Sequence, residues 1–272
     1  MPAKKTLIKK VAPLKVSRRR LKEMPFSRLL PNITTLMSLC TGLSAVRFAL
    51  IDRYEMAVVA ILIAAILDMM DGRLARMLGV DSHFGAELDS LSDFVSFGVA
   101  PALVLYISSL HAWKGFGWAL ALFFVICSAL RLARFNTALL DKKDLPLWRS
   151  RFFIGVPSPA GGFIALLPLM FSFAMEESYA FMPYMCALSL LVAGALMPSR
   201  IPTPSSKGVH IPRSMVLPCM LGAGVVITAL INAFWFTLFA VGIVYLGSLY
   251  FSYKAYCRLR NQESAETEEL AD

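Results

Sequence analysis

Apolar runs of about 18–20 residues recur along the chain and limit what it can fold into. Coiled as a helix, a run of this length crosses a hydrocarbon core about 30 Å thick. The chain has 272 residues, of which 57% are hydrophobic and only 17% are charged. A soluble domain carries about 25% charged residues. The sequence therefore predicts an all-α polytopic membrane protein.

We expect a bundle of eight transmembrane helices. They cover residues 31–50, 54–75, 89–109, 115–136, 158–175, 180–197, 213–231 and 233–253. The last two are separated only near Asn232, within an apolar stretch that is too long for one span. The whole chain divides into a basic, amphipathic juxtamembrane segment (1–30), a transmembrane domain (31–256) and a disordered, polar tail (257–272).

The basic residues predict the orientation of this bundle. With eight spans, all of the 27 Lys and Arg residues except Arg47, Arg53 and Lys114 fall on one side. Cytoplasmic loops are enriched in Lys and Arg, so this side is cytoplasmic and carries both termini. The segment 1–30 either lies on anionic membrane lipids or fixes the topology, and the two readings are compatible. Topology thus accounts for the net charge of +9, and nucleic acid is not an expected partner.

Four aspartates interrupt the apolar pattern, namely Asp68, Asp71, Asp89 and Asp93. The first two are three residues apart near the end of the second expected helix, and the other two are four apart in the third. Each pair therefore lies on one helical face. A short connection makes these helices antiparallel neighbours. We expect all four carboxylates to converge at one cytoplasmic-side cleft.

Four clustered carboxylates require cations. Oxygen ligands favour Mg²⁺, Mn²⁺ or Ca²⁺, and four separated acids suit two ions, a recurrent arrangement in phosphoryl chemistry. Gly72 and Gly85 leave room for a bulky phosphate-bearing ligand beside the helix backbones. Arg76 lies one turn beyond Gly72, where it can pair with a phosphate. The scattered cysteines and isolated histidines predict neither a disulfide framework nor a zinc site.

The spacing D-x2-D-G-x2-A-R-x8-G-x3-D-x3-D resembles the signature of the CDP-alcohol phosphatidyltransferases. It is complete here as Asp68, Asp71, Gly72, Ala75, Arg76, Gly85, Asp89 and Asp93. The resemblance implies an enzyme that displaces CMP from a CDP-linked lipid. It also implies that the first three aspartates bind the metals that engage the pyrophosphate, with Asp89 bridging both ions. Asp93 would contact the second ion and act as general base on the acceptor hydroxyl.

The wider sequence resembles the phosphatidylserine synthase branch of this family. The resemblance covers most of residues 30–210 through LPNITT (30–35), FGAELDSLSDFVSFGVAP (84–101), RLARFN (131–136), FFIGVPSPA (152–160) and SRIPTPSSK (199–207). It implies CDP-diacylglycerol as donor, L-serine as acceptor, and Asn32 and Thr35 as further residues of the CDP and phosphate site. One departure is Ser38, where relatives often have Asn, which could alter a contact in the nucleotide or lipid pocket.

Serine is a zwitterion, so its carboxylate needs a basic partner. Arg131, Arg134 and Arg151 lie near the expected cytoplasmic face and are the candidates. For each of them alone, a solvated positive charge or a phosphate contact is the alternative. Relatives are often homodimers, and the small residues at positions 222–224 would permit close packing of two copies.

Three alternatives stay open at this point. The acids could be salt-bridged to Arg73, Arg131 or Arg134 and merely hold the bundle together. A sibling transferase would use inositol, glycerol phosphate or choline as acceptor. Ionisable groups within a membrane usually have a function. In an ion-coupled transporter, the four acids would be the ion-binding sites. The sequence shows no internal repeat of the kind common in transporters.

Overall fold

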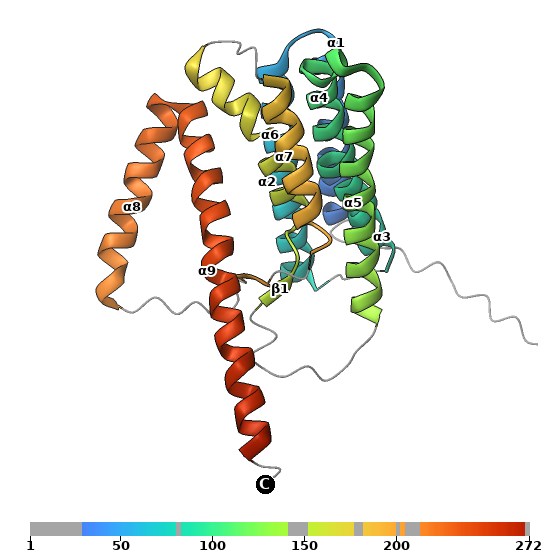
Figure 1. Cartoon of the computed structure of the whole chain (residues 1–272). Helices are drawn as coiled ribbons and strands as arrows, with labels where there is room; N and C mark the ends of the chain where they lie inside the picture. The colour runs from blue at the N-terminus through green and yellow to red at the C-terminus, as the bar shows by residue number, and fades with distance from the viewer. Residues whose placement is uncertain are drawn as a thin grey trace, which may run out of the picture.

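The computed structural model describes residues 29–79, 83–140, 152–176, 182–199, 202–204 and 213–269. Helices dominate these residues (Figure 1). The elements are α1 (Leu30–Leu50), α2 (Tyr54–Leu78), α3 (His83–Asp93), η2 (Phe94–Val99), α4 (Ala100–Ser108), η3 (Leu110–Trp113), α5 (Lys114–Leu140), β1 (Phe152–Ile154), α6 (Ser158–Met175), α7 (Met182–Leu196), β2 (Pro202–Pro204), α8 (Arg213–Asn232) and α9 (Phe234–Glu269).

Each expected span has a helical counterpart. Among the described residues, six helical segments are long and apolar enough to cross a membrane: 30–50, 83–108, 110–137, 158–175, 215–232 and 234–254. These segments identify an integral membrane protein. Helix α7 has only 15 residues, and α2 carries Asp68 and Asp71 together with two arginines near its end, which lower its hydropathy. The confirmed features are therefore the helical fold and six candidate spans.

Some helices are longer than their apolar runs. The third expected span begins at residue 89, whereas α3 begins at His83 and continues through η2 and α4 to Ser108. Likewise α9 continues to Glu269, into the segment expected to be a disordered tail. Hydropathy detects the part of a helix that suits a membrane, whereas Glu, Ala and Leu continue the helix beyond it. The three-part division of the chain stays a prediction.

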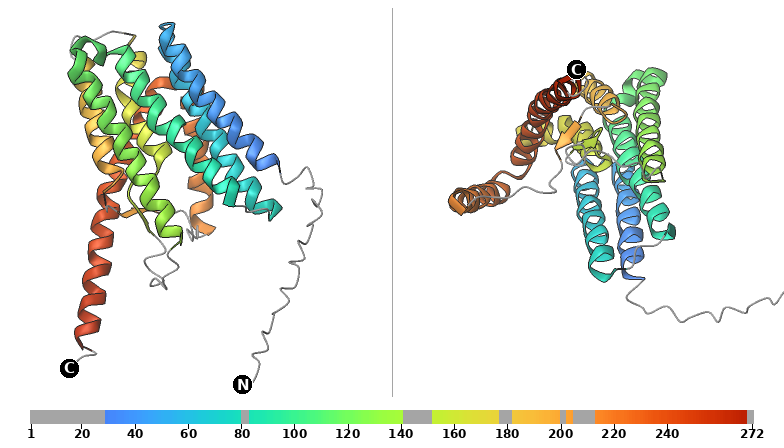
Figure 2. Two further views of the ribbon diagram at one scale, coloured as in Figure 1. Left: turned by 90° about the vertical axis from the view of Figure 1, so that its right-hand side faces the viewer. Right: turned by 90° about the horizontal axis from the view of Figure 1, so that it is seen from below.

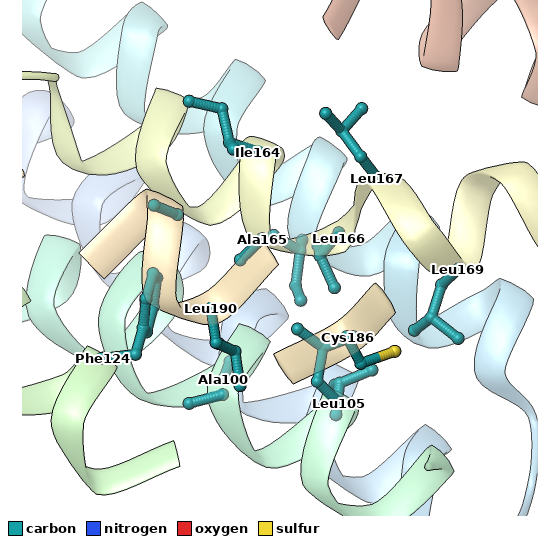
Figure 3. Packing of buried hydrophobic residues seen from close by; sticks show 14 of the residues in the cluster. Ala100, Leu105, Phe124, Ile164, Ala165, Leu166, Leu167, Leu169, Cys186 and Leu190 are labelled. Atoms are coloured by element: carbon teal, nitrogen blue, oxygen red, sulfur yellow. The ribbon is translucent and has the colours of Figure 1, made fainter. Parts of the chain in front are cut away.

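Helices α1, α2 and α3 run side by side at a slant to α5 (Figure 2). The apolar core lies among α4, α5, α6 and α7, where the side chains of Leu105, Phe124, Leu166 and Leu190 are buried (Figure 3). Helix α8 stands apart from this bundle, forms a hairpin with α9 and is exposed along its apolar length (Figures 1 and 2). Helix α8 ends at Asn232 and α9 begins at Phe234, so the break lies next to the residue at which the sequence predicts it.

Two short strands join segments that are far apart in the sequence. Strands β1 and β2 pair antiparallel, with Phe153 opposite Thr203. After β1 the chain turns at Gly155, whose φ of +83° favours glycine and whose added Cβ would lie 2.5 Å from the Met197 carbonyl oxygen. Helix α6 then begins at Ser158, where prolines on either side suit a helix start. Strand β1 of the FFIGVPSPA segment is thus joined to β2, which lies beside α9.

The contact between α1 and η2 leads to a stability prediction. A Cβ added to Gly42 would lie 2.7 Å from Ser96 Cβ and 2.8 Å from Ser96 Cα, closer than real side chains approach. Gly42→Ala should therefore destabilise the fold by about 1–3 kcal/mol through overpacking. Thermal unfolding in detergent measures this, with Gly247→Ala as control because an added Cβ there would meet no described atom within 4 Å. Equal melting temperatures for the two variants would contradict the close contact.

Candidate active site

Helices α2 and α3 bring three carboxylates together. Asp68, Asp71 and Asp89 each offer one oxygen, and these oxygens all lie within 4.8 Å of one another. The side chain of Asp71 is buried, with 4% of its surface exposed. Like charges at this separation repel strongly away from bulk water, and a hard cation relieves that repulsion with the oxygen ligands it prefers. The convergence expected from the sequence spacing is present for these three residues.

Asp93, the last residue of α3, lies beside this cluster. Its carboxylate comes within hydrogen-bonding distance of that of Asp68. Its Oδ1 is buried and has no hydrogen-bond partner among the described residues. A buried oxygen without a partner is costly, so it marks a position for a cation or a donor group. The π-helical turn η2 begins immediately after Asp93, and such turns occur frequently at functional sites.

Helix α1 holds the acidic cluster through Thr35. The Thr35 hydroxyl lies 2.7 Å from Asp71 Oδ2, to which it donates a hydrogen bond, and 2.9 Å from the Pro31 carbonyl oxygen. In return, Ser92 Oγ on α3 donates to the Thr35 carbonyl oxygen at 3.2 Å. Thr35 thus connects all three helices of the site and orients one carboxylate. Asn32, half-buried, lies one turn earlier on the same side of α1.

Ser38 packs helices rather than lining the site. Its hydroxyl is fully buried and donates to the Ala64 carbonyl oxygen of α2 at 2.9 Å. Its own carbonyl oxygen accepts a hydrogen bond from Ser96 Oγ at 3.3 Å. The departure from Asn at this position therefore affects the contact between α1 and its neighbours, because the hydroxyl is already used there.

Asn136 supports the site from α5, and sequence reasoning did not single it out beyond its motif. Its side-chain amide nitrogen lies 3.1 Å from Ser90 Oγ, and its amide oxygen lies 3.2 Å from the same atom. Ser90 immediately follows Asp89 in the chain. The pair therefore fixes the turn of α3 that presents Asp89. The only sequence signal for this role was the presence of both residues in segments that resemble the family.

The three candidate arginines differ in their surroundings. Arg131 donates a hydrogen bond to Ser158 Oγ at 2.5 Å and is close enough to Asp68 and Asp93 for its charge to act on both. Arg134 donates to the Pro198 carbonyl oxygen at 2.5 Å and is exposed, so part of its donor capacity ties α5 to the end of α7. Arg151 lies outside the described residues. Of the described pair, Arg131 is the one beside the carboxylates.

The remaining motif residues lie at the start of α3 and the end of α2. An added Cβ on Gly72 would meet only the Arg76 guanidinium, at 3.9 Å, among the described atoms. Arg76 is exposed and thus covers an open stretch of backbone. Gly85 lies half-buried in the first turn of α3. Ala75 is in α2, but its side chain lies outside the described set. This arrangement has space and positive charge for a phosphate.

No salt bridge occupies the four aspartates among the residues that the structure describes. Within the described parts of the chain, none of the four aspartates forms an ion pair with an arginine or lysine. The interpretation of the cluster as a structural salt-bridge network therefore finds no support there. A set of oxygen ligands with an unpartnered buried carboxylate oxygen instead fits a hard divalent cation.

Comparison with known families decides the assignment. The family model for CDP-alcohol phosphatidyltransferase matches residues 28–198, which include all four aspartates and helices α1 to α7. The chain belongs to the CDP-alcohol phosphatidyltransferase family. The family resemblance drawn from the aspartate spacing is thereby confirmed, and the metal-suited cluster is the feature that this membership leads one to expect.

Individual relatives are similar over much of the chain. A protein of Mycobacterium tuberculosis (strain ATCC 25618 / H37Rv) named CDP-diacylglycerol–serine O-phosphatidyltransferase is 36% identical over 230 residues, which are 84% of this chain and 79% of the relative. A protein of the same name from Mycobacterium leprae is 42% identical over 187 residues, 68% of this chain and 61% of the relative. Another, from Bacillus subtilis, is 33% identical over 178 residues, 65% of this chain and 91% of the relative.

Proposed function

We propose that the protein is a phosphatidylserine synthase, which transfers the phosphatidyl group of CDP-diacylglycerol to the hydroxyl of L-serine and releases CMP. The observation that carries the proposal is the convergence of Asp68, Asp71 and Asp89 beside the unpartnered oxygen of Asp93. Family membership supports the reaction class. The names of relatives from several bacteria support serine as the acceptor.

The proposal includes an orientation in the membrane. Eight helices cross the bilayer, both termini lie in the cytoplasm, and the acidic cluster opens to that side. This rests on the distribution of Lys and Arg, of which only Arg47, Arg53 and Lys114 fall on the opposite side. Labelling single cysteines introduced at positions 52 and 207 in sealed vesicles would test it. Equal labelling from the outside at both positions would contradict the orientation.

The four aspartates would hold two divalent ions, Mg²⁺ or Mn²⁺, with Ca²⁺ as a further oxygen-seeking ion. Asp68, Asp71 and Asp89 are assigned to the metals that engage the pyrophosphate, Asp89 to both ions and Asp93 to the second. When bound, the ions supply positive charge that neutralises the pyrophosphate and stabilises the leaving CMP. Around them, Gly72 leaves space for the phosphates, and Arg76 offers them a bidentate partner.

The reaction needs one proton acceptor from the protein. Asp93 removes the proton of the serine hydroxyl as the oxygen attacks the β-phosphorus, forming the new P–O bond while the bond to CMP breaks. The acyl chains of the donor stay in the bilayer, and serine arrives from the cytosol. A single displacement forms no phosphatidyl-enzyme. Exchange of labelled CMP into CDP-diacylglycerol in the absence of serine would contradict this step.

Serine recognition is assigned to the basic residues. Arg131 is the strongest candidate for the serine carboxylate because it lies beside the acidic cluster. Arg134 and Arg151 stay candidates, although Arg134 already donates to a backbone carbonyl oxygen. The acceptor itself is tested by comparing serine with inositol, glycerol phosphate and choline at fixed CDP-diacylglycerol. If CMP release depends on one of the other alcohols, the reaction class is correct and the assignment of serine as the acceptor is wrong.

The hydrogen bond from Thr35 to Asp71 gives a further prediction. Thr35→Val removes the donor that orients the carboxylate, and loss of such a supporting contact typically weakens metal binding about 10–100-fold. We expect the Mn²⁺ concentration for half-maximal CMP release to rise by about tenfold or more. Thr34→Val is the matched control, because that hydroxyl donates only to backbone carbonyl oxygens of α1.

Two measurements decide this prediction. Titration of CMP release with Mn²⁺ gives the apparent affinity, and electron paramagnetic resonance of free Mn²⁺ gives binding without turnover. Unchanged binding in Thr35→Val, with Thr34→Val also unchanged, would show that Asp71 does not depend on Thr35 for its role.

We also propose that the protein is a homodimer. The support is the exposed apolar helix α8, in which a Cβ added to Gly222 or Gly224 would meet no described atom within 4 Å. Such small residues would let a second helix approach closely. Light scattering of the purified protein, corrected for bound detergent, measures the mass. A mass of one 30.0 kDa chain would contradict the dimer.

A further inference from the structure

Helix α9 lies outside residues 28–198, the part that matches the family, yet one of its faces packs into the bundle. Gly242 lies so close to Leu167 of α6 that an added Cβ would overlap it, and Leu249 is only 5% exposed. Tyr245 lies three residues after Gly242 and four before Leu249, so it shares this inward face. It is partly buried against the apolar core. Its phenol therefore points toward the bundle.

Arg131 of α5 lies near this face of α9, because its guanidinium is close enough to the Tyr245 phenol for the two groups to interact electrostatically. The same guanidinium acts on Asp68 and Asp93, donates to Ser158 and lies over the Phe135 ring, 5.5 Å from its centroid. Arg131 is thus held in place by α5 and α6, and it links the acidic cluster to α9.

Both side chains have hydrogen-bonding capacity left. A guanidinium has five N–H donors, and Arg131 uses one side-chain hydrogen bond among the described residues, to Ser158. Within the same described set, the Tyr245 hydroxyl forms no hydrogen bond. Only Asp93 Oδ1 and Ser128 Oγ are fully buried polar atoms without a partner among the described residues, so the Tyr245 hydroxyl keeps some accessible surface. The guanidinium and this hydroxyl are therefore both available to bind a ligand.

A cation and a neutral hydrogen-bond donor that lie near each other can bind the two oxygens of one carboxylate. The nearby aspartates repel such an anion, so it needs both donors to be held close to them. We propose that Tyr245 binds the carboxylate of the amino-acid acceptor together with Arg131, and that α9 thereby supplies a specificity-determining residue. This inference rests on the proposed function, since an acceptor such as choline or inositol has no carboxylate.

Tyr245→Phe tests the inference, because it removes the hydroxyl and keeps the ring. With CDP-diacylglycerol saturating, we expect KM for serine to rise about tenfold or more, the usual effect of losing a hydrogen bond to a charged group. KM for CDP-diacylglycerol and kcat at saturating serine should stay within about twofold. Tyr250→Phe is the matched control, since Tyr250 lies on the same helix and is 66% exposed.

A second readout separates binding from packing. Serine methyl ester keeps the hydroxyl and the amine but lacks the anionic carboxylate. As a competitor of labelled serine, the ester should need a much higher concentration than unlabelled serine to inhibit the parent protein by half. In Tyr245→Phe these two inhibitory concentrations should lie closer together. Thermal unfolding in the same detergent reports whether the variant is folded.

The outcomes are distinct. A serine KM equal to that of the parent protein, or an equal rise in the KM of both substrates, overturns the role of Tyr245 and leaves the proposed function intact. A parent protein that releases CMP only with another alcohol overturns the proposed function, and this inference with it. A selective rise in serine KM with a narrowed preference over the methyl ester supports the inference.

Discussion

Replacing Asp93 by Asn should abolish most of the CMP release. Asparagine has the same shape but cannot accept the proton of the acceptor hydroxyl, and a positioned general base contributes about 10²–10⁴-fold to the rate. The substitution should be tolerated by the fold, because Asp93 Oδ1 has no hydrogen-bond partner to lose among the described residues. We therefore expect a folded protein whose turnover is lower by about two to four orders of magnitude.

The control for Asp93→Asn is Glu87→Gln, a carboxylate on the exposed side of the same helix, which should retain full activity. A titration with Mn²⁺ separates the two roles assigned to Asp93. If high Mn²⁺ restores turnover, Asp93 serves as a metal ligand and another group takes the proton. If Asp93→Asn turns over at the parental rate at the Mn²⁺ concentration that just saturates the parent protein, both roles are wrong.

Removing divalent cations should be equally damaging. One oxygen each of Asp68, Asp71 and Asp89 lies within 4.8 Å of the others. Without cations, the negative charge of these carboxylates repels the pyrophosphate. Treatment with a chelator should reduce CMP release to background, and added Mn²⁺ or Mg²⁺ should restore it. The loss should exceed about 10³-fold, because metal ions contribute several kcal/mol of charge stabilisation in such reactions.

Elemental analysis makes this second experiment decisive. Protein that has been freed of metal and still releases CMP at the parental rate would contradict the assignment of the cluster. Two ions per chain in the active protein would support the two-metal arrangement. One ion per chain would contradict it and indicate a one-metal site. Asp71→Asn provides a variant with the same shape and weakened binding, since Asp71 is buried in the cluster.

The same experiments separate the enzyme from an ion-coupled transporter. A transporter would carry solute without releasing CMP and would tolerate loss of the base function of Asp93. Membership in a transferase family and the open backbone at Gly72 beneath Arg76 favour the enzyme. Metal-dependent CMP release by the purified protein in detergent, where no gradient exists, cannot come from a transporter.

Much of the helical fold and the acidic cluster could be predicted from the sequence. Apolar runs specify helices when a membrane removes water from the backbone, so α6 was expected at residues 158–175 and occupies Ser158–Met175. The spacing of Asp68, Asp71 and Asp89 placed them on facing helices that a short connection brings together. Local periodicity and a short connection were enough for this part of the site.

Other features depend on contacts between distant segments. Ser158 and Tyr245 look like ordinary residues at a helix start and within an apolar helix, and only the packing of α6 and α9 brings them to Arg131. The π-helical turn from Phe94 to Val99 has no signal in its own composition. The pairing of β1 with β2 joins segments about 50 residues apart in the chain. Sequence periodicity does not report such long-range contacts.

The most direct test of the account measures both products of one reaction. Purified protein in detergent receives CDP-diacylglycerol, Mn²⁺ and labelled serine, and CMP and labelled lipid are quantified together. We expect equal amounts of CMP and phosphatidylserine, and we expect Asp93→Asn to form neither. CMP release without labelled lipid, or no CMP from folded and metal-loaded protein with any acceptor, would contradict the proposed function.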